Sequence, residues 1–205
     1  MNKLFSGLGK KPAIKKPIIV VSGLPRSGTS MMMKVLVEGG LSVVTDEIRG
    51  ADEDNPNGYF ELEVVKQMSE GKLEWLAEAG GKVVKVISAL LEHLPSEYTY
   101  RVIFMEREIK EILASQKKML AHRNEEPRVD DEEIEAQFRK HLSVVKPWLV
   151  RQPNMEVLYV NYNEMMRDAA PFCKRVVDFL GLPLDIERMV SVPSKDLYRN
   201  RKVSA

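Results

Sequence analysis

Several features that would point to particular classes of protein are scarce in this sequence. The 205 residues include one cysteine, Cys173, so no internal disulfide can form and a reducing cytoplasm is the expected location. Three histidines are too few to suggest a clustered metal site. The formal net charge is only +1, so no global charge indicates nucleic acid as a partner. The apolar run Ile18 to Val21 is far too short for a signal peptide or a membrane span.

The length and composition fit one globular domain. A chain of 205 residues can bury a sizeable core, and 44% hydrophobic with 30% charged residues is typical of soluble globular proteins. The first sixteen residues carry five lysines and no acid, so we expect a flexible basic segment there. The sequence therefore predicts a segment at 1–16 followed by a single domain at 17–205.

A glycine-bracketed loop follows the first expected strand. The spacing of Gly23-Leu-Pro-Arg-Ser-Gly28 is that of a P-loop, in which backbone N–H groups and a helix N-terminus bind phosphate. A loop for ATP or GTP would have lysine after the second glycine, but this position is Thr29, and the positive charge lies inside the loop on Arg26. The loop predicts a phosphate site poorly suited to ordinary nucleoside triphosphate chemistry. A strand-to-helix turn without a ligand is the alternative interpretation.

Short β-branched runs alternate with helical segments along the whole chain. This alternation calls for a parallel sheet with helices on both faces. Together with the loop, it predicts an α/β, P-loop NTPase-like three-layer fold with a five-stranded parallel sheet flanked by helices and the first strand at its centre. The five expected strands lie at residues 17–22, 41–44, 82–87, 101–105 and 155–160.

A second anion site is expected at the carboxyl end of the fourth strand. Arg107 ends that strand, and Ser115 follows eight residues later, two turns along a helix and on about the same face. Both side chains can then contact one anion, and arginine binds a phosphate with two parallel hydrogen bonds. The alternative is that Arg107 pairs with Glu111, four residues on.

The two motifs together resemble those of sulfotransferases that use 3′-phosphoadenosine 5′-phosphosulfate (PAPS). In that family the loop binds the 5′-phosphosulfate, and the arginine–serine pair binds the 3′-phosphate. A tyrosine after the last strand resembles the family's adenine-side tyrosine. The nucleotide contacts implied by the resemblance are Pro25, Arg26, Ser27, Gly28, Thr29, Ser30, Arg107, Ser115 and Tyr162. The basic tail with Arg199, Arg201 and Lys202 is either a further contact to the 3′-phosphate or a solvated chain end.

The resemblance also implies catalytic cations. Lys85 falls on the lysine of the Lys-x-His motif that cytosolic sulfotransferases carry, and Arg26 would act with it at the sulfuryl group that is transferred. The histidine position of this motif is Ile87, so the family's usual base is missing.

A carboxylate is therefore the expected base. In tyrosylprotein sulfotransferases a Glu-Glu-Thr-Arg segment aligns with Asp46-Glu-Ile-Arg49 of this chain, which gives Glu47 the position of the catalytic glutamate. Bacterial sulfotransferase-like proteins often share the run Asn55-Pro-Asn-Gly-Tyr-Phe-Glu61, so Glu61 is the reserve candidate. A carboxylate partly withdrawn from water can take the acceptor's proton.

The function implied is transfer of a sulfuryl group from PAPS to a hydroxyl or amine on a small-molecule, peptide or sugar acceptor. Adenosine 3′,5′-bisphosphate (PAP) would be the product, and no metal is expected. The acceptor's identity and the oligomeric state stay open. Two alternatives remain: a nucleotide or small-molecule kinase, because residues 102–106 resemble a Walker B strand that ends in an acid at Glu106, and a nucleotide-binding module without catalysis.

Overall fold

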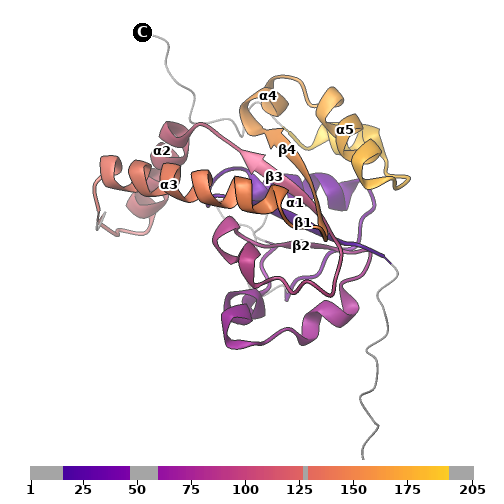
Figure 1. Ribbon diagram of the computed structural model, residues 1–205. Helices are drawn as coiled ribbons and strands as arrows, with labels where there is room; N and C mark the ends of the chain where they lie inside the picture. The colour runs from indigo at the N-terminus through magenta and orange to yellow at the C-terminus, as the bar shows by residue number, and fades with distance from the viewer. Residues whose placement is uncertain (1–15, 47–59, 127–128, 194–205) are drawn as a thin grey trace, which may run out of the picture.

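A computed structural model of the chain describes residues 16–46, 60–126 and 129–193 (Figure 1). A parallel sheet with the strand order β2-β1-β3-β4 forms its centre. The strands are β1 (Ile18–Gly23), β2 (Val83–Lys85), β3 (Tyr100–Glu106) and β4 (Met155–Asn161). Val20 of β1 aligns with Val84 on one side and with Val102 on the other. The first strand therefore lies inside the sheet, with β2 and β3 as its neighbours.

The prediction of a five-stranded sheet is wrong, because the sheet that the described residues form has four strands. In the segment expected as the second strand, residues 41–44, Val43 forms only an isolated parallel bridge with Val83 of β2. After this bridge the chain pairs with a different segment: the backbone N–H of Asp46 donates to the carbonyl of Glu61, 3.4 Å away. Asp46 thus lies next to Glu61.

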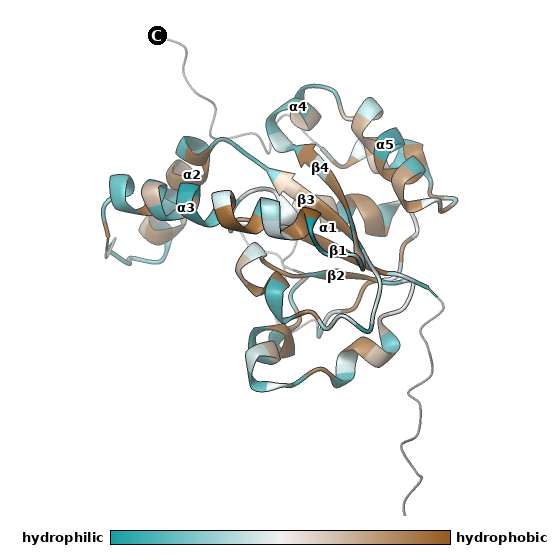
Figure 2. Cartoon of the chain, viewed as in Figure 1, coloured by the Kyte–Doolittle hydropathy of each residue, from teal (hydrophilic) through white to brown (hydrophobic). Residues whose placement is uncertain are grey.

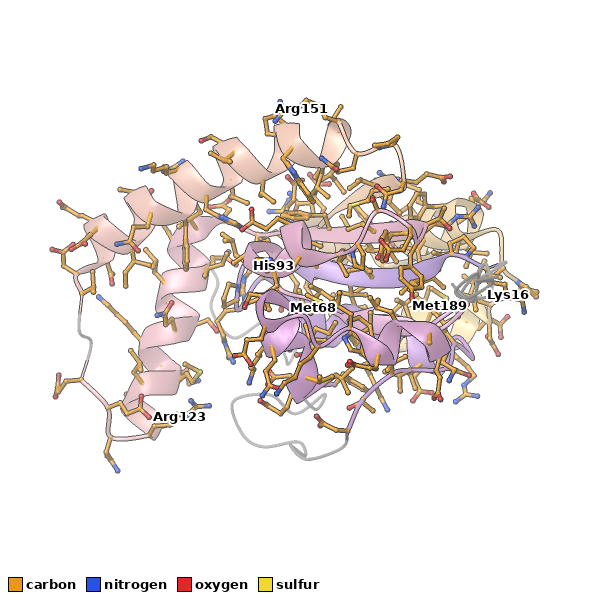
Figure 3. The ribbon with its side chains drawn as sticks, turned by 60° about the horizontal axis from the view of Figure 1, so that its bottom comes forward. Lys16, Met68, His93, Arg123, Arg151 and Met189 are labelled. Atoms are coloured by element: carbon orange, nitrogen blue, oxygen red, sulfur yellow. The ribbon has the colours of Figure 1, made fainter. Side chains whose placement is uncertain are left out.

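Helices cover both faces of the sheet, as the three-layer prediction requires (Figure 1). The α-helices are α1 (Thr29–Glu38), α2 (Ile109–His122), α3 (Asp131–Val150), α4 (Tyr162–Arg167), α5 (Ala170–Leu180) and α6 (Ile186–Ser191). Three 3₁₀-helices are η1 (Glu63–Glu70), η2 (Glu74–Glu78) and η3 (Ser88–His93). The 3₁₀-helices lie below the sheet in the view of Figure 1, and η1, which contains Met68, packs against η3, which contains His93 (Figure 3).

Successive side chains of β1 point to opposite faces of the sheet, and the hydrophobic core has one part on each face. Ile19 and Val21 pack with residues of α1, α5 and α6 on one face, whereas Ile18 and Val20 pack with the 3₁₀-helices and α3 on the other. All four side chains are at most 2% exposed. Figure 2 shows the strands as a brown, hydrophobic centre, and the helices as brown inward and teal outward. The buried strand explains why the run is apolar at every position.

The second and third helices form a hairpin that projects from the sheet (Figure 1). In Figure 3, Arg123 at the end of α2 marks its tip and Arg151 after α3 marks its base. The side chain of Asp130 caps α3 by accepting a hydrogen bond from the N–H of Glu133 at 2.8 Å, as expected for an acid at this position. The first helix of this hairpin, α2, follows the carboxyl end of β3 and lies beside the loop after β1, where Ser115 contacts Arg26.

Two further observations concern the limits of the domain. Among the helices within the described ranges, none combines the length and the apolar character needed to cross a bilayer. Residues 1–15 lie outside the described residues, so the expected boundary between 1–16 and 17–205 stays a prediction.

Candidate active site

The loop after β1 has a backbone that few residue types can adopt. Gly23 and Gly28 have φ angles of 144° and 100°, in the region that favours glycine. A Cβ atom at Gly28 would lie 2.4 Å from the ring of Tyr162, so no side chain fits there. Arg26 also has a positive φ, 67°, which is uncommon for a residue with a side chain and is often found at functional positions.

The loop leads into the first turn of α1, as the P-loop spacing predicts. Pro25 is exposed, whereas Ser27 is buried and Thr29, the first residue of α1, is 5% exposed. The first N–H groups of a helix have no partner within the helix, and they carry the positive end of its dipole. The loop and α1 therefore form the anion-binding geometry expected from Gly23 and Gly28.

The structure brings four of the expected nucleotide contacts together on the β3 side of this loop. Arg26 Nε donates to Ser115 Oγ at 3.0 Å, and Arg107 Nη1 donates to the backbone oxygen of Arg26 at 3.1 Å. The guanidinium of Arg107 lies 4.4 Å from the ring centroid of Tyr162. We name Arg26, Arg107, Ser115 and Tyr162 the β3-side cluster.

Arg107 also forms the ion pair with Glu111 that was expected as the alternative to an anion site. Its Nε donates to Glu111 Oε2 at 3.1 Å, and both side chains are only 6% exposed. Burial of this kind makes each partner dependent on the other, since an unpaired buried charge is costly. Glu111 holds the guanidinium in place beside the loop, and the spacing of four residues was the signal for this contact.

A second group of charged side chains lies on the β2 side of the loop. Lys85 Nζ is 3.3 Å from Ser30 Oγ in the first turn of α1 and 3.4 Å from Glu61 Oε1. The side chains of Lys85 and Glu61 are 9% and 23% exposed. We name Ser30, Glu61 and Lys85 the β2-side cluster. Lys66, which sequence reasoning missed, lies 3.7 Å from Glu61 Oε2 and adds a second cation beside this carboxylate.

Local backbone contacts fix Glu61 at this position. Phe60 has a φ of 49°, an unusual conformation that turns the chain directly before Glu61. The hydroxyl of Thr45 donates to the carbonyl of Glu61 at 2.8 Å, and Asp46 Oδ2 accepts from the N–H of Glu63 at 2.6 Å. The reserve candidate for the base thus lies next to the expected catalytic lysine.

Other expected residues fall outside the described part of the chain. Glu47, the first candidate for the base, directly follows Asp46 in the sequence and is among them, as are Arg199, Arg201 and Lys202. Their roles stay predictions.

A cavity of about 90 Å³ lies under the loop, between β3, α2 and α3. Ser27 lines it, and its buried Oγ has no hydrogen-bond partner among the described residues. Glu106, the Walker B-like acid, also lines it and forms an ion pair with Lys146 of α3. No motif predicted this pair, because the two residues are 40 positions apart.

Metal-binding side chains do not cluster in the described part of the chain: no group of three or more histidine, cysteine or acidic residues could hold an ion there. What the described residues form is a P-loop α/β domain with two charged clusters beside the loop, one on each side of β1.

Comparison with known proteins identifies the family. The sulfotransferase domain matches residues 16–203, nearly the whole chain, so the chain belongs to the sulfotransferase domain family. A comparison with curated protein sequences found no match.

Two of the solved structures that match this chain are a sulfotransferase and a sugar kinase. A crystal structure of mouse sulfotransferase SULT7A1 complexed with PAP has a TM-score of 0.49 and 16% identity, over 93% of this chain and 66% of that chain. An unliganded sugar kinase from Janibacter sp. has a TM-score of 0.42 and 13% identity, over 87% of this chain and 99% of that one. The chain thus spans slightly less than two thirds of the mouse sulfotransferase.

Proposed function

We propose that the protein transfers a sulfuryl group from PAPS to a hydroxyl or amine acceptor, leaving PAP, and that no metal takes part. The family match over residues 16–203 supports this function. One structural observation carries it: Arg26 of the loop contacts Ser115 and Arg107, which lie 89 and 81 residues further along the chain. Two phosphate-binding motifs that are distant in the sequence thereby form one surface, as a nucleotide with phosphates at both its 5′ and 3′ positions requires.

The nucleotide would lie across the end of β1. The backbone N–H groups of residues 27–30 are suited to the 5′-phosphosulfate, since they start a helix. Arg107 and Ser115 are suited to the 3′-phosphate, and the buried ring of Tyr162 supports the Arg107 guanidinium. An adenine contact for Tyr162 stays a prediction.

The reaction needs positioning and charge stabilisation more than covalent help. A carboxylate takes the proton of the acceptor as the acceptor atom attacks sulfur. The bond between sulfur and the bridging oxygen breaks, and its electron pair leaves on that oxygen. Lys85 would stabilise this charge, which its contact with Ser30 in the first turn of α1 supports, and the resemblance gives Arg26 a share in the role. Glu47 or Glu61 would be the base.

The kinase alternative fits the described contacts less well. In a Walker loop the hydroxyl at the position of Ser30 binds Mg²⁺. Here Ser30 Oγ lies 3.3 Å from the ammonium of Lys85, so an added metal ion would meet a fixed positive charge. The acid Glu106 is paired with Lys146. Lys85 thus supplies positive charge where a kinase would hold its metal.

The test is a transfer assay with sulfur-labelled PAPS in the presence of a chelator. Acceptors would cover phenols, alcohols, amines, tyrosine peptides and sugars, and we expect label in at least one class together with release of PAP. Nucleotide binding without label in any acceptor would instead support the non-catalytic module. Magnesium-dependent ATP turnover that is lost on changing Glu106 but not Arg107 would support the kinase. The acceptor class and the cytoplasmic location stay predictions.

A further inference from the structure

The transfer end of the proposed site depends on the shortest strand of the sheet. β2 has three residues and lies at the edge of the sheet that the described residues form. On its outer side, Val43 supplies an isolated bridge to Val83. A short edge strand has few backbone hydrogen bonds, so it opens locally more easily than an inner strand. Lys85, the expected cation at the sulfuryl group, is the last residue of this strand.

Two hydrogen bonds to distant elements hold the segment that follows β2. The N–H of Val86 donates to the carbonyl of Val21 in β1 at 3.0 Å, and η3 then begins at Ser88. Ser88 is 3% exposed, and its hydroxyl forms a hydrogen bond of 2.8 Å with Nε2 of His141 in α3. The position of Ser88 thus depends on a residue 53 positions further along the chain.

The third α-helix is a well-anchored support for this contact. It has 20 residues and packs against both η3 and β4, and Figure 1 shows it returning from the tip of the hairpin across the sheet. Further along the helix than His141, Lys146 forms an ion pair with Glu106 at the end of β3. Leu142, between these two residues, lines the cavity under the loop. α3 therefore connects the end of the edge strand β2 with the end of the inner strand β3.

The contact between His141 and Ser88 suits a neutral imidazole. Burial lowers the pKa of His141 below its usual value of 6.5, while the carboxylate of Glu92 in η3 acts in the opposite direction, so the ring is neutral at pH 7. A neutral ring has one donor and one acceptor nitrogen, and a hydroxyl can take either role. Removing the ring would leave the buried hydroxyl of Ser88 without this partner, which disfavours the packed position of η3.

We infer that His141 is a positioning residue for sulfuryl transfer: through Ser88 it fixes the end of β2, and with it the ammonium of Lys85. The inference rests on the proposed function, which gives Lys85 its role. Lys85 Nζ lies 3.3 Å from Ser30 Oγ and 3.4 Å from Glu61 Oε1, at the long end of hydrogen-bond distances, so a small shift of β2 weakens both contacts. His141 acts through Ser88 and not by contact with a substrate.

The test compares His141→Leu with His141→Gln. Leucine removes the hydrogen bond to Ser88, whereas the side-chain amide of glutamine can keep it. In His141→Leu, kcat for transfer from labelled PAPS to the acceptor class identified in the transfer assay should fall by about 10- to 100-fold, the range for a misplacement of up to about 1 Å. The affinity for PAP in calorimetry should stay within about twofold, because PAP lacks the sulfuryl group that Lys85 would contact. His141→Gln should restore most of the lost turnover.

Amide hydrogen exchange measures the position of β2 independently of activity. In His141→Leu the amides of residues 83–91 should exchange faster, while those of β1 and β3 should not change. Turnover of the double variant Ser88→Ala/His141→Leu should be no lower than that of His141→Leu, because both changes remove the same contact. If His141→Leu folds poorly, Ser88→Ala alone provides the comparison. The control Lys140→Met, at an exposed lysine of the same helix, should change none of these quantities.

Three results would overturn the inference. A loss of turnover in His141→Leu that His141→Gln does not restore would mean that the imidazole itself takes part in the chemistry. An equal loss of PAP affinity would indicate a general loss of structure, and unchanged turnover would show that Lys85 does not depend on this contact. Failure of the proposed function would look different, because the unmodified protein would then bind no PAP or label no acceptor, while faster exchange at residues 83–91 would still occur in His141→Leu.

Discussion

Replacing Glu111 by glutamine should destabilise the fold substantially, because it leaves Arg107 with a buried, uncompensated charge. Both side chains are 6% exposed, so solvent screens the pair very little. Removing one partner of such a pair typically costs about 3–5 kcal/mol. We expect about 3 kcal/mol, the lower end, since glutamine can still accept the hydrogen bond from Arg107 Nε. For a domain of this size this corresponds to a fall in Tm of about 6–12 °C.

The same substitution should strengthen the effect of PAP. If Arg107 binds the 3′-phosphate, as proposed, this phosphate becomes the main counter-charge for Arg107 in Glu111→Gln, so PAP should bind more tightly than to the unmodified protein. Stabilisation by a ligand grows with its affinity, and the rise in Tm on adding PAP should therefore be larger in the variant. A purely structural ion pair, distant from the nucleotide, would not produce this coupling.

Urea unfolding and thermal scans with and without PAP measure both effects. The matched control is Glu135→Gln, since Glu135 and Arg139 also form an i, i+4 pair, 3.0 Å apart at Nε, but Arg139 is 65% exposed. The control should lose less than about 0.5 kcal/mol. If Glu111→Gln is as mild as the control, or if PAP stabilises it less than the unmodified protein, the account of Arg107 is refuted.

Four further predictions follow from single positions. Gly28→Ala should abolish PAP binding in calorimetry, because its φ of 100° and the neighbouring ring leave no room for a Cβ. Burial lowers the pKa of His141, so the unfolded state takes up a proton first; the contribution of this histidine to stability should be constant above about pH 6.5 and fall below it, and His141→Gln should remove this part of the loss in urea titrations. Burial raises the pKa of Cys173 to about 11, and this fully buried thiol should react with a thiol reagent only when the protein unfolds. Glu47→Gln should lower turnover by about two to four orders of magnitude with nearly unchanged PAP affinity. Near-normal turnover in Glu47→Gln, with loss of turnover in Glu61→Gln, would assign the base to Glu61 instead.

Elements defined by local pattern could be predicted from the sequence. The β-branched runs gave β1, β3 and β4, and the 3.6-residue periodicity with an acidic cap gave α3. The second of the five expected strands, at 41–44, was wrong because strand pairing depends on a distant partner: after one bridge with Val83, the backbone N–H of Asp46 donates to the carbonyl of Glu61. The six-residue helices α4 and α6 were missed, since they are too short to show a period.

The site was predictable to the extent that it follows from strand ends. Carboxyl ends of parallel strands meet at one edge of the sheet, so the loop after β1 and Arg107 were expected to be close together. The role of Lys85 came from the resemblance to the family and not from a strand end. The partners of these residues depend on packing between distant segments. Neither the bond from Arg26 to Ser115 nor the contact of Lys85 with Glu61 has a signal in local spacing, because 89 and 24 residues separate the partners.

The central claim, a metal-free site for a nucleotide with both a 5′ and a 3′ phosphate, is tested most directly by calorimetry in a chelating buffer. PAP and ATP would be titrated into the full chain under identical conditions. The account predicts that PAP binds without metal and far more tightly than ATP, because the β3-side cluster recognises the 3′-phosphate and the loop has Thr29 in place of the lysine that ATP requires. Equal or weaker binding of PAP would contradict it.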